Sequence, residues 1–345
     1  MTKHIIKLTG GAALLLSLAA SVSAQVKLND VVTVNGWATA SYQYTKWQPG
    51  TNVDSFNVDA ALLGAVITPA KGLTGNVSLY YRPSAEGGVS PGGSELTLLD
   101  AYLSYDAGGG VTVSVGKFLS YLGYESFYLI NDNMITLANQ QFLAPIPGYH
   151  EGIKLDYAPD KTTTVGVSLA DSEFQKPGYA ATAGDGELKH NGGLEGYFQY
   201  TGVTNLTIWG GVGYQTSTKP GVDTSEVADP AGSAVTVWDL WVSYQIDKNS
   251  TLALEEIYKD GGAGNKGSNW LAYYQYNFTD KVSSWFSISG ESVSDGGPSY
   301  VKYSISPTYA VNANFSVRAQ YSYTDYSKFS ADSANFIGAE VLFKF

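Results

Sequence analysis

Two kinds of connection alternate along this chain, and their order constrains the fold more than any other feature of the sequence. Seven connections are short and polar, centred on residues 70–72, 108–110, 159–161, 202–205, 247–249, 279–281 and 311–313. Eight longer connections, mostly rich in Gly, Pro and Asp, alternate with them at residues 47–54, 83–94, 118–148, 172–191, 216–234, 260–268, 295–298 and 327–333. This order predicts sixteen antiparallel strands, with every short turn at the same end of the sheet.

The composition favours strands over helices. The chain contains 26 Tyr, 7 Trp, 13 Phe and 39 Gly, and only 15% of its 345 residues are charged. Aromatic and β-branched residues favour strands, whereas Gly, Asn and Asp favour turns. No window after Ala24 shows the 3.6-residue apolar period of a long helix. We therefore expect an all-β fold.

Apolar and polar side chains alternate along the strand-like segments, for example over residues 301–309 and 315–324. Alternation alone would fit a half-buried sheet in water equally well. Short turns at one end, long loops at the other and an even strand number are typical of outer-membrane barrels. Aromatic girdles at the bilayer interfaces are also expected, and we assign to them the tyrosine pairs 42 and 44, 80 and 81, and 274 and 276. We predict a transmembrane antiparallel β-barrel of about sixteen strands over residues 25–345.

The chain begins like an exported protein. Lys3 and Lys7 precede an apolar run over residues 8–20, and small residues precede Gln25, as in a secretory signal peptide. The run is too short to span a bilayer as a helix. We predict a cleaved signal peptide over residues 1–24 and localisation in the outer membrane of a Gram-negative bacterium.

Charge and cysteine content exclude several classes of partner. The formal net charge of -11 argues against nucleic acid, whose phosphates need a basic surface. The chain has no cysteine and no pair of histidines at ligand spacing, so we predict no cofactor and no metal centre. Calcium bound by acids of the external loops, such as Asp223 and Glu226, stays an open alternative. The expected partners are small hydrophilic solutes, ions and membrane lipid.

The longest connection, residues 118–148, is rich in aromatic and amide side chains, and Glu125 and Asp132 are its only charged residues before the next strand. A loop of this length in a compact structure is usually functional or disordered. Its apolar content argues against disorder. We therefore expect it to pack against another part of the barrel.

The ends of this connection resemble one known family, the OmpL-like β-barrel porins of Gram-negative bacteria. The residues that carry the resemblance are Val115-Gly116-Lys117-Phe118, Gly123-Tyr124-Glu125 and Tyr149-His150-Glu151-Gly152-Ile153. The resemblance implies an outer-membrane channel for small solutes and brings no catalytic residues with it. Sixteen-stranded porins fold their third external loop inward, so by resemblance residues 119–147 narrow the lumen. Glu125 and Asp132 would then lie near the solute path.

Strand parity predicts which charged residues face the lumen. The inward bases are Arg82, Lys154, Lys302, Arg318 and Lys344, and the inward acids are Asp59, Asp100, Asp156, Glu195, Asp239, Glu291 and Glu340. Lys117 has the other parity and would need a bulge at Gly116 to point inward. General porins carry an arginine cluster at the constriction, whereas this chain has only two arginines, so we expect no strong transverse field.

An excess of fixed acids biases a pore towards cations, unless paired lumen charges cancel. We therefore expect a weak cation preference. The candidate constriction and lumen residues are Glu125, Asp132, Arg82, Asp100, His150, Lys154, Asp156, Lys302, Arg318 and Glu340.

Three other functions remain alternatives to a diffusion porin. A carbohydrate channel could use an aromatic track made of Trp37, Tyr102, Tyr197, Trp209, Trp241, Tyr273 and Trp285, which have inward parity; the same rings could instead fill gaps beneath loops. An outer-membrane enzyme could use His150, although we expect this histidine to be hydrogen-bonded to Glu151 or to a loop carbonyl. A structural barrel would conduct nothing. Trimers are common for barrels of this size and closed symmetry is the general rule for oligomers, so a homotrimer is the candidate assembly.

Overall fold

The computed structural model describes residues 25–81, 96–125, 132–138, 141–143, 145–172, 188, 192–216, 234–262 and 265–345. The predicted signal peptide and the candidate Arg82 lie outside these ranges. Among the described residues, no helix is long and apolar enough to cross a membrane.

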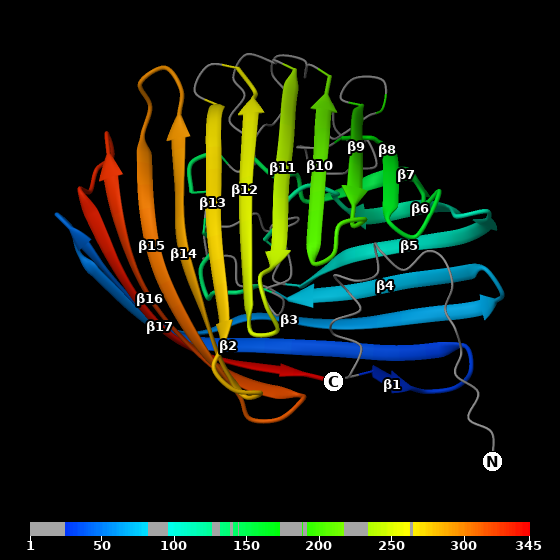
Figure 1. The fold of residues 1–345 in the computed structure, drawn as a ribbon, viewed down its shortest axis with the longest axis horizontal. Coiled ribbons are helices and arrows are strands. Elements are labelled where there is room, and N and C mark those ends of the chain that lie inside the picture. Colours follow the sequence, from blue (N-terminus) through cyan, green and yellow to red (C-terminus); the bar gives the residue numbers. More distant parts are fainter. Residues whose placement is uncertain are drawn as a thin grey trace.

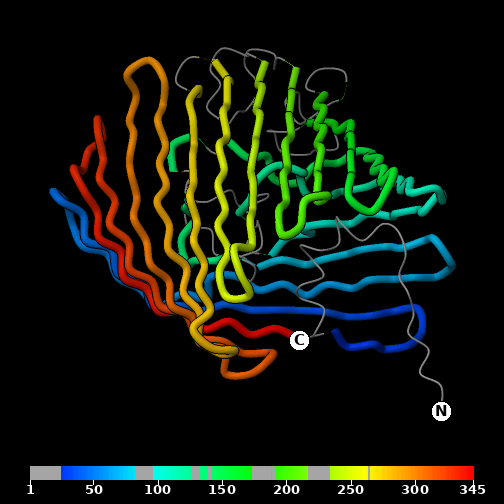
Figure 2. The backbone as a smooth tube through the Cα atoms, in the orientation of Figure 1, coloured from blue at the N-terminus to red at the C-terminus, as the bar shows by residue number. Residues whose placement is uncertain are grey.

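Sixteen long antiparallel strands close into a barrel over this part of the chain (Figure 1; Figure 2). They are β2 (Val32–Gln48), β3 (Asn52–Ala70), β4 (Leu73–Tyr81), β5 (Leu96–Gly108), β6 (Val111–Leu119), β7 (Tyr149–Tyr157), β8 (Thr163–Ala170), β9 (Gly193–Tyr200), β10 (Leu206–Gln215), β11 (Val235–Gln245), β12 (Ser250–Asp260), β13 (Lys266–Asn277), β14 (Val282–Val293), β15 (Ser299–Ala310), β16 (Phe315–Ser327) and β17 (Ser333–Lys344). The prediction of about sixteen strands is confirmed.

The barrel closes between its first and last long strands. β17 pairs with β2 from Ser333 opposite Gln48 to Lys344 opposite Trp37. A short additional strand, β1 (Gln25–Lys27), pairs with the next residues of β2 and so continues the line of β17. Between the two, the Gly36 N–H and C=O each bond to the backbone of Phe345. The C-terminal aromatic residue is therefore part of the closing seam.

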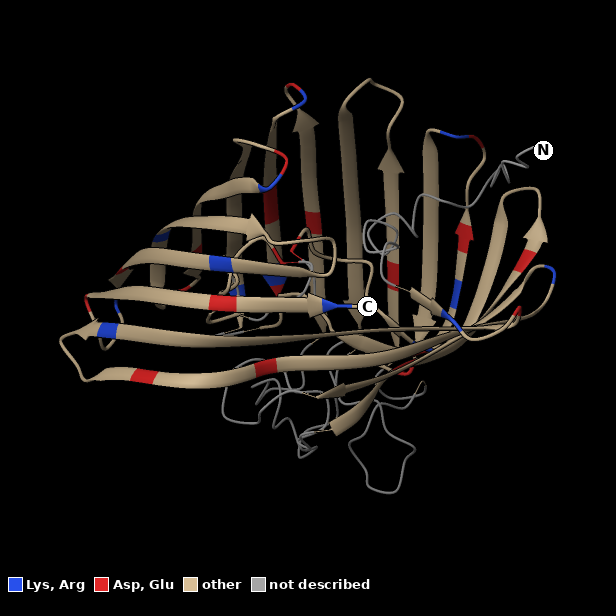
Figure 3. Cartoon of the chain, turned by 90° about the horizontal axis from the view of Figure 1, so that it is seen from below, with Lys and Arg blue, Asp and Glu red and all other residues tan. Residues whose placement is uncertain are grey.

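The alternation of the sequence becomes an inward and an outward face. Along β16, inward residues such as Gln320 and Ser322 are buried, while outward residues such as Val317 and Tyr321 are exposed. Charged residues are sparse along the strands, and several gather at their connections (Figure 3). Because strand side chains alternate between faces, one correct register orients the whole strand.

Tyr80, one of the tyrosines predicted to form the aromatic girdle, points the other way. It is fully buried inside the barrel, and its ring centroid lies 5.9 Å from that of Trp37. Adjacent strand residues face opposite sides, so Tyr80 and Tyr81 cannot both contribute to an outer girdle. The assignment of Tyr80 to the girdle was wrong.

Lys117 faces outward because β6 runs through Gly116 in continuous register with β5 and with β7. The Lys117 ammonium donates to the Leu98 carbonyl at 2.9 Å, and Glu151 lies directly opposite Lys117 on β7. The bulge that would have turned Lys117 into the lumen is absent from this described stretch. Lys117 is therefore not a lumen charge.

Three clusters of buried apolar side chains lie inside the described part of the barrel. One consists of strand residues only and is centred on Trp37, Leu62 and Tyr80. The other two include residues of the connection between β6 and β7, namely Leu122 in one cluster and Met134 with Ala138 in the other. The long connection therefore contributes to the core of the barrel.

Candidate functional site

The connection between β6 and β7 folds into the barrel. We call residues 120–148 the inward loop; residues 126–131, 139–140 and 144 of it are outside the described part. Its first and last residues are joined to each other, since Ser120 N donates to the Gly148 carbonyl at 2.9 Å. Between these ends, the described segments contact strands between β7 and β17.

Glu195 of β9 holds the start of the inward loop. It accepts hydrogen bonds from the Ser120 hydroxyl at 2.5 Å and from Tyr121 N at 2.9 Å. The same carboxylate lies 3.2 Å from Nε2 of His150, whose side chain is fully buried. Glu151, one of the two partners we expected for this histidine, follows it directly in β7 and so points to the other face of the wall. His150 thus belongs to the loop anchor.

The next two amides of the loop continue around the wall. Gly123 N donates to Oδ2 of Asp239 on β11 at 2.6 Å. Tyr124 N donates to Oε1 of Glu255 on β12 at 2.5 Å. Residues 120–124 therefore bond to carboxylates of β9, β11 and β12.

Leu122 supplies the apolar part of this anchor. It packs in a buried cluster with Tyr197, Trp209 and residues of β11 and β12. Two glycines of β10 that face inward, Gly211 and Gly213, leave room for Leu122. A Cβ on Gly211 would lie 2.8 Å from Leu122 and 2.4 Å from the Trp209 ring. A Cβ on Gly213 would lie 3.3 Å from Leu122. A larger residue at position 211 would occupy the space of the loop.

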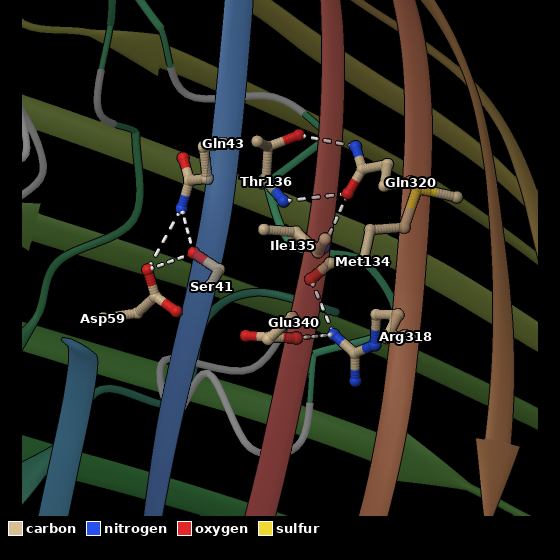
Figure 4. A network of polar contacts seen from close by, with 9 residues as sticks. All are labelled: Ser41, Gln43, Asp59, Met134, Ile135, Thr136, Arg318, Gln320 and Glu340. Atoms are coloured by element: carbon tan, nitrogen blue, oxygen red, sulfur yellow. Dashed lines mark hydrogen bonds and ion pairs between the residues drawn. The ribbon is translucent and has the colours of Figure 1, made fainter. Parts of the chain in front are cut away.

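The tip of the inward loop, residues 134–138, bonds to β14, β15 and β16. Figure 4 shows the part of the tip beside Arg318 and Gln320 of β16. Arg318 donates through Nη1 to the Met134 carbonyl at 2.9 Å. Oε1 of Gln320 accepts hydrogen bonds from Ile135 N at 2.6 Å and Thr136 N at 3.1 Å, and its Nε2 donates to the Thr136 hydroxyl at 2.7 Å. One neutral side chain thus satisfies three polar groups of the tip.

The second half of the tip bonds to β14 and β15. The Lys302 ammonium donates to the Thr136 hydroxyl at 2.8 Å and to the Leu137 carbonyl at 2.6 Å. The Ser289 hydroxyl donates to the Ala138 carbonyl at 2.5 Å. Each residue from 134 to 138 therefore has at least one backbone or side-chain polar group bonded to these strands.

Glu125 joins two parts of the inward loop to the wall. Both of its oxygens accept a hydrogen bond from Ala138 N, at 3.0 and 2.9 Å, and it also accepts one from the Tyr273 hydroxyl of β13. Asp132, the other acid predicted to lie near the solute path, is buried. The described contacts give Glu125 a structural role.

Glu291 of β14 holds the returning segment. Its carboxylate accepts hydrogen bonds from three consecutive backbone N–H groups, those of Gln141, Phe142 and Leu143, at 2.5 to 3.0 Å. The buried Lys259 of β12 donates to the Leu143 carbonyl at 2.9 Å. The carboxylate of Glu291 therefore accepts from loop N–H groups, and the ammonium of Lys259 donates to a loop carbonyl.

This division recurs along the inward loop. A loop inside a barrel must find partners for its backbone polar groups. Here wall carboxylates accept from loop N–H groups, whereas wall cations donate to loop carbonyls. Hydrogen bonds to ionised partners are roughly twice as strong as neutral ones. The inward charges of this wall therefore hold the loop.

Sequence parity missed two of these anchors, Glu255 and Lys259. The segment around them contains Glu255 and Glu256 in succession, and the apolar Ile257 faces inward with Glu255 and Lys259. The sequence feature that could have found them is the pair Leu252 and Leu254. Both leucines face outward, so the odd-numbered residues of β12, which include Glu255 and Lys259, face inward.

Asp59, Glu340 and Arg318 form a polar row on the adjoining strands. A register shift between Thr39 and Ala40 marks a bulge in β3, where Asp59 and Ala60 are both buried. Asp59 accepts hydrogen bonds from Ser41 at 2.7 Å and from Gln43 at 3.1 Å. Oε2 of Glu340, which lies opposite Ser41, is 3.3 Å from Nη1 of Arg318 (Figure 4).

Lys154 and Asp156 of β7 contact the start of the inward loop. Asp156 accepts hydrogen bonds from the Tyr121 and Tyr197 hydroxyls at 3.1 and 3.2 Å. Burial, together with the nearby Asp156, raises the pKa of Tyr121, so its hydroxyl stays a donor. The Lys154 ammonium lies 5.1 to 5.5 Å from three ring centroids, those of Phe118, Tyr121 and Tyr102, a cation–π arrangement. Asp100, on β5, is buried.

The aromatic side chains proposed as a sugar track pack largely on one another. Trp209 stacks between Tyr197 and Trp241, with centroids 6.0 and 5.8 Å away and rings within 11° of parallel. Trp37, Tyr197, Trp209 and Tyr273 are buried, whereas Tyr102, Trp241 and Trp285 are half-buried. This packing favours the role of gap-filling beneath the loop. Among the described residues, no group of three His, Cys, Asp or Glu side chains converges as metal ligands would.

The fold is that of known outer-membrane proteins. Pseudomonas putida OprB superposes with a TM-score of 0.70 at 11% identity, covering 97% of each chain. An anion-selective porin from Comamonas acidovorans superposes with a TM-score of 0.61 at 12% identity, and the match covers 91% of this chain and 99% of the porin chain. OmpT of Vibrio cholerae in its trimer form superposes with a TM-score of 0.56 at 14% identity, and the match covers 92% of this chain and 100% of the OmpT chain. No curated protein matches the sequence.

Residues 31–345 match the model of the family described as putative beta-barrel porin-2, OmpL-like. The chain belongs to this family. The match covers all sixteen barrel strands, and it confirms the resemblance inferred from the residues around the long connection. The protein is an outer-membrane porin.

Proposed function

We propose that this porin is a passive, water-filled pore for small hydrophilic solutes and ions, narrowed by the inward loop. The observation that carries the proposal is the series of loop contacts that runs along the inner wall from Glu195 of β9 to Arg318 of β16. A loop held across the lumen reduces the cross-section open to solutes. Conductance of the refolded protein in a planar bilayer tests it: discrete ohmic channels are expected, and a folded barrel without conductance would overturn it.

We further propose a weak cation preference. Inward acids outnumber inward bases among the described residues, with Asp59, Asp100, Asp156, Glu195, Asp239, Glu255, Glu291 and Glu340 against Lys154, Lys259, Lys302, Arg318 and Lys344. Several of the acids bond to neutral N–H or hydroxyl groups, which leave their charge uncompensated. Since an anion-selective porin shares this fold, the charge balance rather than the fold has to decide the sign.

The reversal potential in a potassium chloride gradient measures this preference. We expect a potential of the sign that marks cation permeation, and a reduction of it in Asp59→Asn, since a fixed inward acid favours cations. Asp247→Asn, in a turn between β11 and β12, is the matched control and should behave as wild type. A clear anion preference of the wild-type channel would contradict the proposal.

We also propose that the chain is exported by its signal peptide, assembles as a homotrimer and has no enzymatic activity. The trimer form of OmpT, which has the same fold, supports the assembly. The complete burial of His150 against Glu195 supports the absence of catalysis, because a general base must reach its substrate. Any hydrolysis that is lost in His150→Gln would contradict this.

A further inference from the structure

The tip of the inward loop is held by three neighbouring side chains of different charge. Lys302 and Arg318 are cationic, Gln320 is neutral, and all three bond to residues 134–137. We propose that these three are positioning residues that set the aperture of the pore by fixing the loop tip to β15 and β16. This inference rests on the proposed pore function and adds the residues that determine its size limit.

All the hydrogen-bonding capacity of the Gln320 side chain is used by this arrangement. A side-chain amide offers two donor hydrogens and two acceptor lone pairs. Oε1 accepts from two successive amides of the tip, and Nε2 donates to the Thr136 hydroxyl and, at 2.7 Å, to Ser322 of its own strand. The bond to Ser322 fixes the orientation of the amide. The Gln320 amide is therefore already oriented to bind residues 135 and 136; we call Gln320, together with the neighbouring wall groups that contact the tip, the seat of the tip.

Lys302 and Arg318 extend this seat on its two sides. Lys302 contributes two donor bonds, to Thr136 and Leu137, and Arg318 contributes one bond, to Met134. The ion pair with Glu340 steadies the guanidinium on β16. The Thr136 hydroxyl is shared, since it accepts from both Lys302 and Gln320.

Apolar contacts complete the seat. A Cβ on Gly338 of β17 would lie 2.9 Å from Cδ1 of Ile135, so the wall is hollowed by a glycine where this side chain docks. Met134 and Ala138 pack in a buried cluster with Leu271 and Tyr273 of β13. Polar and apolar contacts on both sides of Thr136 thus define one position for the tip.

A charged side chain can affect a pore in two ways, by its field and by the position of what it holds. Gln320 has no charge, so Gln320→Leu removes tip contacts and leaves the fixed charge of the lumen unchanged. Lys344→Met removes a lumen charge and leaves the tip contacts unchanged. Lys344 faces inward near the end of β17, and it makes no hydrogen bond to the described residues of the inward loop. Lys302→Met removes tip contacts and also removes a fixed charge of the lumen. These three variants separate the two effects.

The experiment measures three quantities for each channel in planar bilayers: current noise, the largest polyethylene glycol that enters the pore, and the reversal potential in a potassium chloride gradient. Losing a hydrogen bond to a charged or multiply bonded group should raise the undocked fraction of the tip by about tenfold or more. We expect Gln320→Leu and Lys302→Met to increase current noise and admit larger polymers. Gln320→Leu should keep the wild-type reversal potential. Lys344→Met should shift it towards cations and keep the wild-type size limit.

Two further controls protect the interpretation. The shift between boiled and unboiled samples in electrophoresis reports whether each variant forms the barrel. Thr136→Val changes only the loop and removes the hydroxyl shared by Lys302 and Gln320, so it should reproduce the larger size limit even if a wall variant fails to fold. If Gln320→Leu, Lys302→Met and Thr136→Val conduct with wild-type noise and size limit, the positioning proposal is wrong. If the folded wild-type protein conducts nothing, the proposed pore function fails instead.

Discussion

Two regions of the inner wall use their polar side chains differently. From β9 to β16, which we call the docking wall, inward carboxylates and cations bond to the inward loop. From β2 to β6, the self-paired wall, the described hydrogen bonds join wall to wall, such as Ser41 to Asp59 and Ser104 to Ser114 at 2.7 Å. Around the closed barrel, β2–β5 lie opposite β10–β13.

The apolar clusters repeat this difference. The cluster of the self-paired wall contains strand residues alone, including Trp37, Leu62 and Leu99. Both clusters of the docking wall are completed by loop residues, Leu122 in one and Met134 in the other. Strand parity tells which side chains face inward on both walls. It does not tell whether an inward charge meets solute or backbone, and that distinction decides whether the charge acts on ions or on the loop.

The largest expected effect concerns Glu291, which binds three loop amides. Glu291→Leu should strongly accelerate amide hydrogen exchange of residues 141–143, because each lost charge-assisted hydrogen bond is worth about 1.5–3 kcal/mol. Asp59→Leu, on the self-paired wall, is the matched control and should leave exchange at these residues unchanged. Equal acceleration in both variants would remove the distinction between the walls.

A smaller effect is expected from the space left for Leu122. Gly211→Ala would place a Cβ 2.4 Å from the rigid Trp209 ring, so the free energy of unfolding should fall by about 1–3 kcal/mol. Gly210→Ala is a close control, since its Cβ would point outward, 3.6 Å from Leu240. Denaturant unfolding followed by tryptophan fluorescence measures both. Similar stabilities would show that Trp209 and Leu122 do not pack closely over Gly211.

The smallest effect is expected outside the lumen, at Lys117. It faces outward near the external end of β6, where a charge costs only about 0–1 kcal/mol. Lys117→Met should therefore change the stability of the barrel by less than about 1 kcal/mol and leave conductance and reversal potential as in wild type. A shifted reversal potential would mean that Lys117 acts within the lumen.

Much of the architecture was predictable because it depends on local patterns. Short polar turns such as 108–110 and 279–281 were located from Gly, Asn and Asp, and the alternation of residues 315–324 predicted the faces of β16 correctly. Errors arose where two adjacent residues had the same chemistry. Tyr80 and Tyr81 were both taken as girdle residues, and the succession of Glu255 and Glu256 concealed the inward parity of Glu255 and Lys259.

The candidate site was predictable only as a set of inward residues. The sequence named the long connection, its inward course by resemblance, and acids such as Glu195, Asp239 and Glu291. It could not pair Glu291 with residues 141–143, or Gln320 with residues 135 and 136. These partners are about 150 and 185 residues apart, and no local pattern relates them.

Periodicity and turn chemistry by themselves determined the antiparallel strands, their polar face and the order of short and long connections that is typical of a barrel, because each depends on neighbours within a few residues. The tertiary structure alone decided what the inward charges do. A carboxylate on a barrel strand looks the same in the sequence whether it faces water or a backbone amide. Only the folded loop, with its own N–H and C=O groups to satisfy inside the barrel, assigns Glu195, Asp239, Glu255 and Glu291 to the amides and Lys259, Lys302 and Arg318 to the carbonyls.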